Sequence, residues 1–148
     1  MDIAWALLGI LAGMLIALQG PINAQLAQGL GMPLAAAAAS FIAGSVALVV
    51  LAAIATQVQG ISIAWRVPPW WMFVAGGCLG AAYVTSAIIL TPRLGTAATM
   101  ALIVAGQLTA GLLIDRMGWF GLAVRELSIG RVGGAILLLA GALLIRFG

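Results

Sequence analysis

The side chains best suited to bind a polar molecule are three amides, Gln19, Asn23 and Gln107, which occur in long apolar stretches. A polar group in hydrocarbon costs free energy unless it has a hydrogen-bond partner, so amides in such stretches need a purpose. Gln19 and Asn23 are four residues apart and therefore share one face of a helix. Pro21, between them, lacks a backbone N–H and so frees a carbonyl nearby. We expect these amides either to line a substrate path or to bond one helix to another.

Hydroxyl groups and one carboxylate add further candidates. Tyr83 and Ser86 are three residues apart on one helical face, where a ring and a hydroxyl could hold a ligand or simply pack. Ser40 and Ser45 are expected to bond carbonyls of their own helix. Asp115 is the only carboxylate side chain inside one of the long apolar stretches, so it is the candidate for coupling to protons, or else a charge at a helix end.

The chain lacks the residue types on which most enzymes and metal sites depend. It contains no His and one Cys, so we expect no metal site and no cofactor. It also contains no Lys, and no pair of nucleophile and base can be drawn, so we do not expect an enzyme. The formal net charge of +3 comes from only nine charged residues, six basic and three acidic, and nucleic acid is not an expected partner.

Composition indicates an integral membrane protein. Hydrophobic residues make up 65% of the chain and charged residues 6%, whereas soluble proteins carry roughly 25% charged residues. About 20 apolar residues are needed to span a bilayer. Five such runs predict an all-α fold of one domain, residues 1–148, with helices at about 3–29, 33–58, 69–90, 95–115 and 130–146.

The first apolar run is expected to be a retained helix, because the start of the chain lacks the positive region of a signal peptide. We expect this helix to continue through Pro21, since a proline is tolerated inside a membrane helix. With the N-terminus in the cytoplasm, four of the six Arg residues lie in cytoplasmic loops and two lie outside. This weak bias leaves insertion in both orientations open.

Several short motifs follow one another along the chain. They are Ala17-Leu18-Gln19 with Ile22-Asn23-Ala24, Ser40-Phe41 with Gly44, Pro69-Trp70-Trp71, and Ala105-Gly106-Gln107-Leu108 leading to Ile114-Asp115. In these motifs the whole chain resembles the YdcZ-type family of five-helix membrane proteins. The C-terminal half, with residues 97–102, Glu126-Leu127-Ser128 and residues 133–137, also resembles the drug/metabolite transporter superfamily.

The resemblance implies a bacterial inner-membrane exporter from a family that contains dual-topology homodimers, paired subunits and fused antiparallel two-domain proteins. Of these arrangements we expect the antiparallel homodimer. With an odd number of spans, two copies form an inverted repeat only when they insert in opposite orientations. The small multidrug resistance transporters are similar in using two glycines seven residues apart in the last helix, which implies a dimer interface at Gly134 and Gly141. Ordinary packing within the chain is the alternative. Those transporters carry a glutamate in the first helix, where this chain has Gln19, which cannot titrate.

These observations predict a small secondary transporter that lies in membrane lipid and moves a small polar or amphipathic molecule by alternating access. The expected substrate-binding residues are Gln19, Asn23, Tyr83, Ser86 and Gln107. Two alternatives stay open. A channel or facilitator would use the same amides, and an accessory subunit would be inactive without a paralogous partner.

Overall fold

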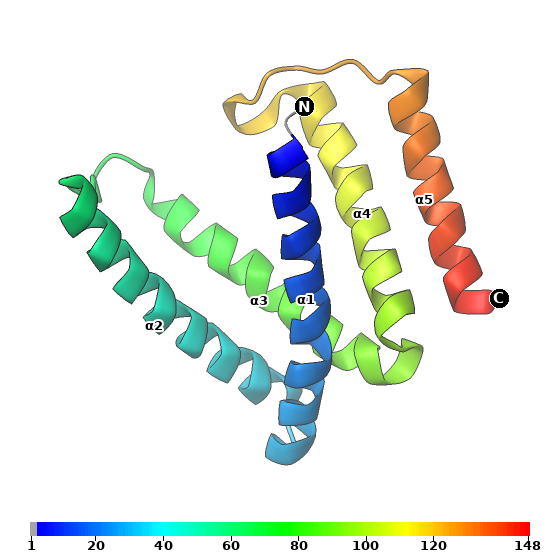
Figure 1. The fold of residues 1–148 in the computed structure, drawn as a ribbon, viewed down its shortest axis with the longest axis horizontal. Helices are drawn as coiled ribbons and strands as arrows, with labels where there is room; N and C mark the ends of the chain where they lie inside the picture. Colours follow the sequence, from blue (N-terminus) through cyan, green and yellow to red (C-terminus); the bar gives the residue numbers. More distant parts are fainter. Residues whose placement is uncertain (1–2) are drawn as a thin grey trace. The chain divides into compact units, whose positions relative to one another are not determined.

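The structure, a computed structural model, describes residues 3–148 and confirms the predicted all-helical architecture (Figure 1). Over these residues, five helices are long and apolar enough to cross a membrane. They are α1 (Ile3–Leu30), α2 (Pro33–Gln59), α3 (Trp70–Leu94), α4 (Thr96–Met117) and α5 (Ile129–Phe147), and a short 3₁₀ helix, η1 (Trp119–Gly121), follows α4. Because a helix satisfies its own backbone groups, this fold suits a solvent without water.

Helix α1 runs through Pro21 without a break, as the sequence predicts. Pro21 cannot donate a hydrogen bond to the carbonyl of Ala17, one turn earlier, but the turns on either side remain helical. At 28 residues, α1 is roughly 42 Å long, which exceeds the hydrocarbon thickness of about 30 Å. A helix of this length fits a bilayer by tilting or by extending into the headgroup region.

Helix α3 is longer than the sequence predicts. We expected it to end near Leu90, before Pro92, but it continues to Leu94 with Pro92 inside its last turns. The proline removes one hydrogen bond there, and the helix ends instead at Gly95, whose φ of +82° is a backbone conformation that favours glycine. The N–H of Gly95 donates to the carbonyl of Thr91 at 3.0 Å, so the helical bonding extends to this glycine.

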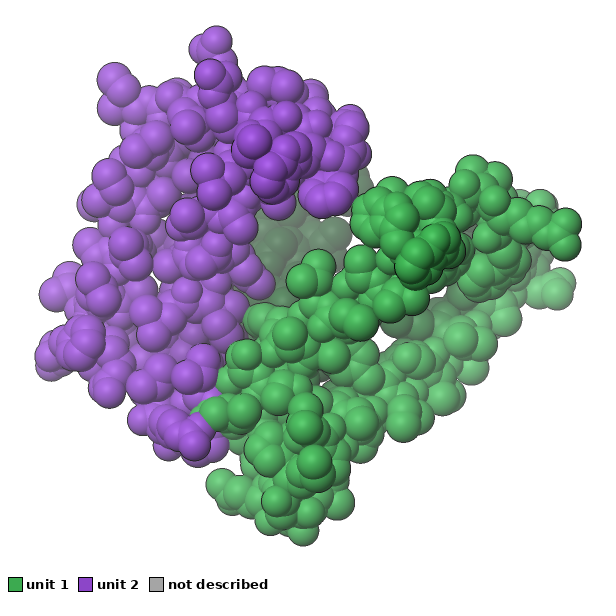
Figure 2. Space-filling model, turned by 180° about the vertical axis from the view of Figure 1, so that it is seen from behind, with its two compact units in different colours: residues 1–89 green, residues 90–148 purple. Residues whose placement is uncertain are grey.

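The chain forms two compact units, which Figure 2 distinguishes by colour. The first ends at Ile89 and the second is Leu90–Gly148, so the boundary falls within α3. The prediction that residues 1–148 form a single domain stays a prediction.

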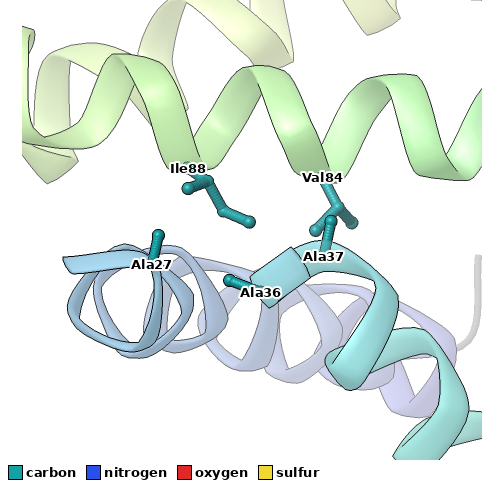
Figure 3. Packing of buried hydrophobic residues seen from close by; sticks show 5 residues of the cluster. All are labelled: Ala27, Ala36, Ala37, Val84 and Ile88. Atoms are coloured by element: carbon teal, nitrogen blue, oxygen red, sulfur yellow. The ribbon is translucent and has the colours of Figure 1, made fainter. Parts of the chain in front are cut away.

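The core of the first unit is built from small side chains near the turn between α1 and α2. Ala27 of α1 and two alanines of α2, Ala36 and Ala37, pack against Val84 and Ile88 of α3 (Figure 3). In lipid there is little hydrophobic force between helices, so close approach of backbones through small residues provides the contact. The α1–α2 turn fits this arrangement because Gly31 adopts a φ of +70° and Pro33 occupies the first turn of α2.

The second unit contains a hairpin in which α4 and α5 lie side by side. Gly118 ends α4 in the left-handed conformation, with a φ of +64°, and its N–H donates to the carbonyl of Ile114. The chain then passes through η1, where Phe120 also has a positive φ of 59°. Ser128 caps α5, since its Oγ accepts a hydrogen bond from the N–H of Arg131 at 3.3 Å.

We predict that Gly118→Ala destabilises the hairpin. A side chain in the left-handed helical region costs about 1–2 kcal/mol. In addition, a Cβ at position 118 would lie 2.7 Å from Cγ2 of Val124 and 3.3 Å from the carbonyl oxygen of Leu122. Thermal unfolding in detergent should therefore occur at a lower temperature than for the parent. Gly111→Ala is the control, because a Cβ there meets nothing within 4 Å; an equal loss of stability in both variants would contradict the prediction.

Candidate functional site

A hollow of about 190 Å³ lies in the first unit, between α1, α2 and α3. Its lining combines hydrogen-bonding side chains with an aromatic ring and aliphatic groups. The lining residues are Gln19, Ser40, Phe41, Gly44, Ser45, Leu48 and Val84. The hollow can therefore offer both hydrogen bonds and apolar contact to one small molecule.

The polar residues of the hollow lie well inside their helices. By helical rise, Gln19 is roughly 24 Å from the start of α1 and 17 Å from its end. Ser45 is roughly 18 Å along α2 from Pro33. Both side chains thus occur at positions that the hydrocarbon core would surround, where a hydrogen bond to a solute is not in competition with bulk water.

Asn23 is buried, with 4% of its surface exposed, and donates from Nδ2 to Oγ of Ser40 at 3.3 Å. This bond joins α1 to α2, and interhelical hydrogen bonds in membranes contribute on average about 0.6 kcal/mol. It also uses a lone pair of Ser40, a residue that lines the hollow. Asn23 thus positions a lining residue, while its direct contact with a substrate stays a prediction.

Tyr83 and Ser86 do not belong to the lining of the hollow. Tyr83 is half-buried and packs against the core of the first unit. Ser86 is exposed, and its Oγ donates to the carbonyl of Ala82 in the same helix at 2.8 Å. Tyr83 is therefore placed to support α3 against the core, and a substrate role for either residue stays a prediction.

Gln107 lies on α4, in the second unit, with its side chain exposed. Two residues later, Thr109 donates from its hydroxyl to the carbonyl of Ala105 at 2.9 Å, which satisfies this second polar side chain within the helix. Gln107 thus presents an amide at the surface of α4, and its participation in a substrate site stays a prediction.

Asp115, near the end of α4, forms a salt bridge between Oδ2 and Nη2 of Arg131 in α5. The neighbouring Arg116 is not the partner in this pair. The backbone takes part as well, because the carbonyl of Asp115 accepts from the N–H of Arg125 at 2.8 Å and Nη1 of Arg131 donates to the carbonyl of Glu126 at 3.4 Å. Asp115 and Arg131 together fasten the loop to both helices.

Each charge of this pair lies at a helix end where the helix dipole disfavours a charge of that sign. Asp115 is in the last turn of α4, where the helix dipole favours a cation, and Arg131 is in the first turn of α5, where it favours an anion. The salt bridge compensates for both positions. The two side chains are about one-third exposed (30% and 32%), and such a pair contributes roughly 0–1 kcal/mol.

We predict that exchanging the two charges, Asp115→Arg with Arg131→Asp, preserves most of the stability. The exchange keeps the pair, places each charge at the favourable helix end and loses only the bond to the Glu126 carbonyl. Asp115→Asn alone leaves Arg131 without its carboxylate and should lower the thermal unfolding temperature in detergent. If the double exchange destabilised the protein more than the single variant, the pair would not act as described.

Gly134 and Gly141 lie on α5, and a Cβ at either position meets nothing within 4 Å. The α4–α5 contact in this chain therefore does not require these two residues to be glycine. Because they lack side chains, they leave room for a helix of another chain to approach closely. The dimer interface at these glycines stays a prediction.

Sequence reasoning missed that Ser40 and Ser45 line the hollow, because both were expected to bond carbonyls of their own helix. A signal was present in the spacing, since Ser40, Gly44 and Leu48 follow one another at intervals of four and therefore share a helix face. Over residues 3–148, no group of three or more His, Cys, Asp or Glu side chains is placed to hold a metal ion.

Comparisons with known proteins agree with this architecture. The family described as "Putative inner membrane exporter, YdcZ" matches residues 4–144. A relative from Escherichia coli (strain K12), "Inner membrane protein YdcZ", is 40% identical over 76 residues, which cover 51% of this chain and 50% of that protein. The matched part thus spans about half the length of this curated relative. No solved structure matches the chain.

Proposed function

We infer the function of this chain from its family and its hollow. The chain belongs to the YdcZ family, described as "Putative inner membrane exporter", and is an inner-membrane protein. We propose that it is a small secondary transporter. Its substrate is a small polar or amphipathic molecule, bound in the hollow between α1, α2 and α3 and moved by alternating access. The observation that carries this proposal is the presence of Gln19, Ser40 and Ser45 in one hollow, with Gln19 and Ser45 near the middle of their helices.

The charge distribution supports a neutral or weakly charged substrate. Neither α1 nor α2 contains an Asp, Glu, Lys or Arg, and the lining residue from α3, Val84, is aliphatic. An ion in this hollow would lose its hydration without gaining a counter-ion, which costs several kcal/mol. Amide and hydroxyl groups can replace the hydrogen bonds that a neutral solute loses when it leaves water.

The size of the hollow also limits the substrate. Pockets for drug-sized molecules measure roughly 300–1,000 Å³, whereas this hollow measures about 190 Å³. It therefore suits a molecule of metabolite size, or one part of a larger molecule whose remainder contacts a second copy of the chain.

We propose that the working unit is an antiparallel homodimer. Five spans place the two ends of a chain on opposite sides of the membrane, so two oppositely inserted copies generate the inverted repeat that many transporters use. The weak asymmetry of Arg residues supports insertion in both orientations. Gly134 and Gly141 on α5 are the proposed contact points, since a Cβ at either position meets open space.

Proton coupling, where it occurs, is assigned to Asp115. Gln19 and Asn23 can bind a solute but cannot carry a proton. Among the residues of the five helices, Asp115 is the one with a carboxylate side chain. Its salt bridge to Arg131 would have to open in each cycle. The exchanged pair described above lacks a carboxylate at position 115, so proton-driven flux that survived in that variant would contradict this assignment.

We predict that Gln19→Leu lowers flux in proteoliposomes at least several-fold, because leucine keeps the bulk of the side chain but removes its hydrogen-bonding groups. The measurement is uptake of neutral metabolites by vesicles that contain purified protein. Gln28→Leu, near the exposed end of α1 and outside the hollow, is the matched control and should transport like the parent.

Three results would count against the proposal in different ways. Equal flux in Gln19→Leu and parent would exclude Gln19 from the site. Flux that does not saturate and shows no exchange would favour a channel or facilitator. Absence of flux from the parent alone, restored by a paralogous chain, would favour an accessory subunit.

For the dimer, we predict that Gly134→Leu and Gly141→Leu each reduce the dimer fraction in detergent, because leucine would separate the two α5 helices. Gly133→Leu is the control on the same helix, since a Cβ at this position also meets nothing within 4 Å but points to another side of α5. An unchanged dimer fraction in both variants, measured by cross-linking or light scattering, would remove these glycines from the interface.

A further inference from the structure

One glycine of α3 is in unusually close contact with the wall of the hollow. A Cβ at Gly80 would lie 3.1 Å from Cζ and 3.4 Å from Cε1 of Phe41, so the phenyl ring rests against the glycine backbone. The other two glycines of this helix, Gly76 and Gly77, have nothing within 4 Å of such a Cβ. Of these three glycines, Gly80 makes room for the ring of Phe41 by lacking a side chain, whereas Gly76 and Gly77 do not contact a neighbour in this way.

The ring of Phe41 lies between the core and the hollow. It packs against the core cluster of the first unit and at the same time lines the hollow. The cluster against which it packs is almost fully buried, with exposed fractions of 8% or less. Because the packed core leaves few voids, we expect a ring that is displaced from Gly80 to move toward the hollow.

We propose that Phe41 sets the size of the molecule that the hollow admits, and that Gly80 is the positioning residue that holds the ring back. The part of this inference that concerns the size of the transported substrate rests on the proposed transport function. The part that concerns the size of molecules entering the hollow can be tested without transport. The admitted molecule is a compact neutral solute with a hydrogen-bonding group for Gln19 and an apolar part for the face of Phe41.

Substitution at Gly80 would act through the ring. Real Cβ contacts are seldom as short as 3.1 Å, so Phe41 must shift by a few tenths of an ångström in Gly80→Ala. Ser45 lies four residues after Phe41 on the same face of α2, and it also lines the hollow. A thiol at position 45 can therefore report how the position of the ring affects the access of a reagent to the hollow.

The experiment uses Ser45→Cys in a Cys78→Ala background, because the natural Cys78 is exposed and would react as well. Methyl methanethiosulfonate and benzyl methanethiosulfonate serve as a small and a large neutral probe, and their modification rates are compared for the full-length protein in detergent. We expect Gly80→Ala to slow the benzyl reagent several-fold with little effect on the methyl reagent. Gly77→Ala is the matched control, since it adds the same methyl group to the same helix in open space.

Two further variants separate the effect of the Phe41 ring on the labelling rates from the effect of Gly80. Phe41→Leu alone should speed the benzyl reagent, and Phe41→Leu combined with Gly80→Ala should restore at least the parent rate, because the shorter side chain no longer meets the new methyl group. Equal rates in Gly80→Ala and Gly77→Ala, or no acceleration in Phe41→Leu, would overturn the inference.

Transport of a series of neutral solutes of increasing size provides the functional readout. Gly80→Ala should lower the largest size that is transported, and Phe41→Leu should raise it. If labelling depends on position 80 as described but the parent transports no solute, the size limit of the hollow stands and the proposed function fails. If the parent transports but the labelling rates do not differ, the transporter stands and the role of Phe41 fails.

Discussion

The cost of an unpartnered polar group in hydrocarbon governs the placement of polar side chains in this protein. Asn23 is buried and bonded to Ser40, Ser86 and Thr109 bond carbonyls of their own helices, and Asp115 is paired with Arg131. In residues 3–148 the exception among buried side chains is Thr99, whose Oγ1 has no hydrogen-bond partner. Against this background, Gln19 is conspicuous because it lines a hollow in which a solute could become its partner.

Much of the fold was predictable because it depends on local rules. Apolar runs of membrane-spanning length predicted five helices, and the tolerance of membrane helices for proline predicted that α1 continues through Pro21. The expectation that α3 ends before Pro92 did not follow this rule and was wrong, because α3 continues through the proline to Leu94. There the conformation of a glycine, which can adopt a positive φ, ends the helix more effectively than the missing N–H of the proline.

The site was predictable only in part, because it depends on which helix faces meet. The sequence singled out Gln19 and Asn23, but the partner of Asn23 comes from another helix, 17 residues along the chain. Likewise, Asp115 pairs with Arg131, 16 residues away, rather than with the adjacent Arg116. Side-chain spacing within one helix does not identify such tertiary partners. The spacing of Ser40, Gly44 and Leu48 indicates a shared helix face, but the folded chain is needed to show that this face lines a hollow.

The absence of formal charge on α1 and α2 has a consequence for the energetics of the proposed transport. The membrane potential does work of about 2.3 kcal/mol per 100 mV only on an elementary charge that crosses the field. A neutral solute held by amides and hydroxyls carries no such charge, so the voltage across the inner membrane neither drives nor opposes that step. In the proposed transport, flux through this hollow would therefore not depend on the voltage, and its direction would be set by the solute's own gradient and by any coupled ion.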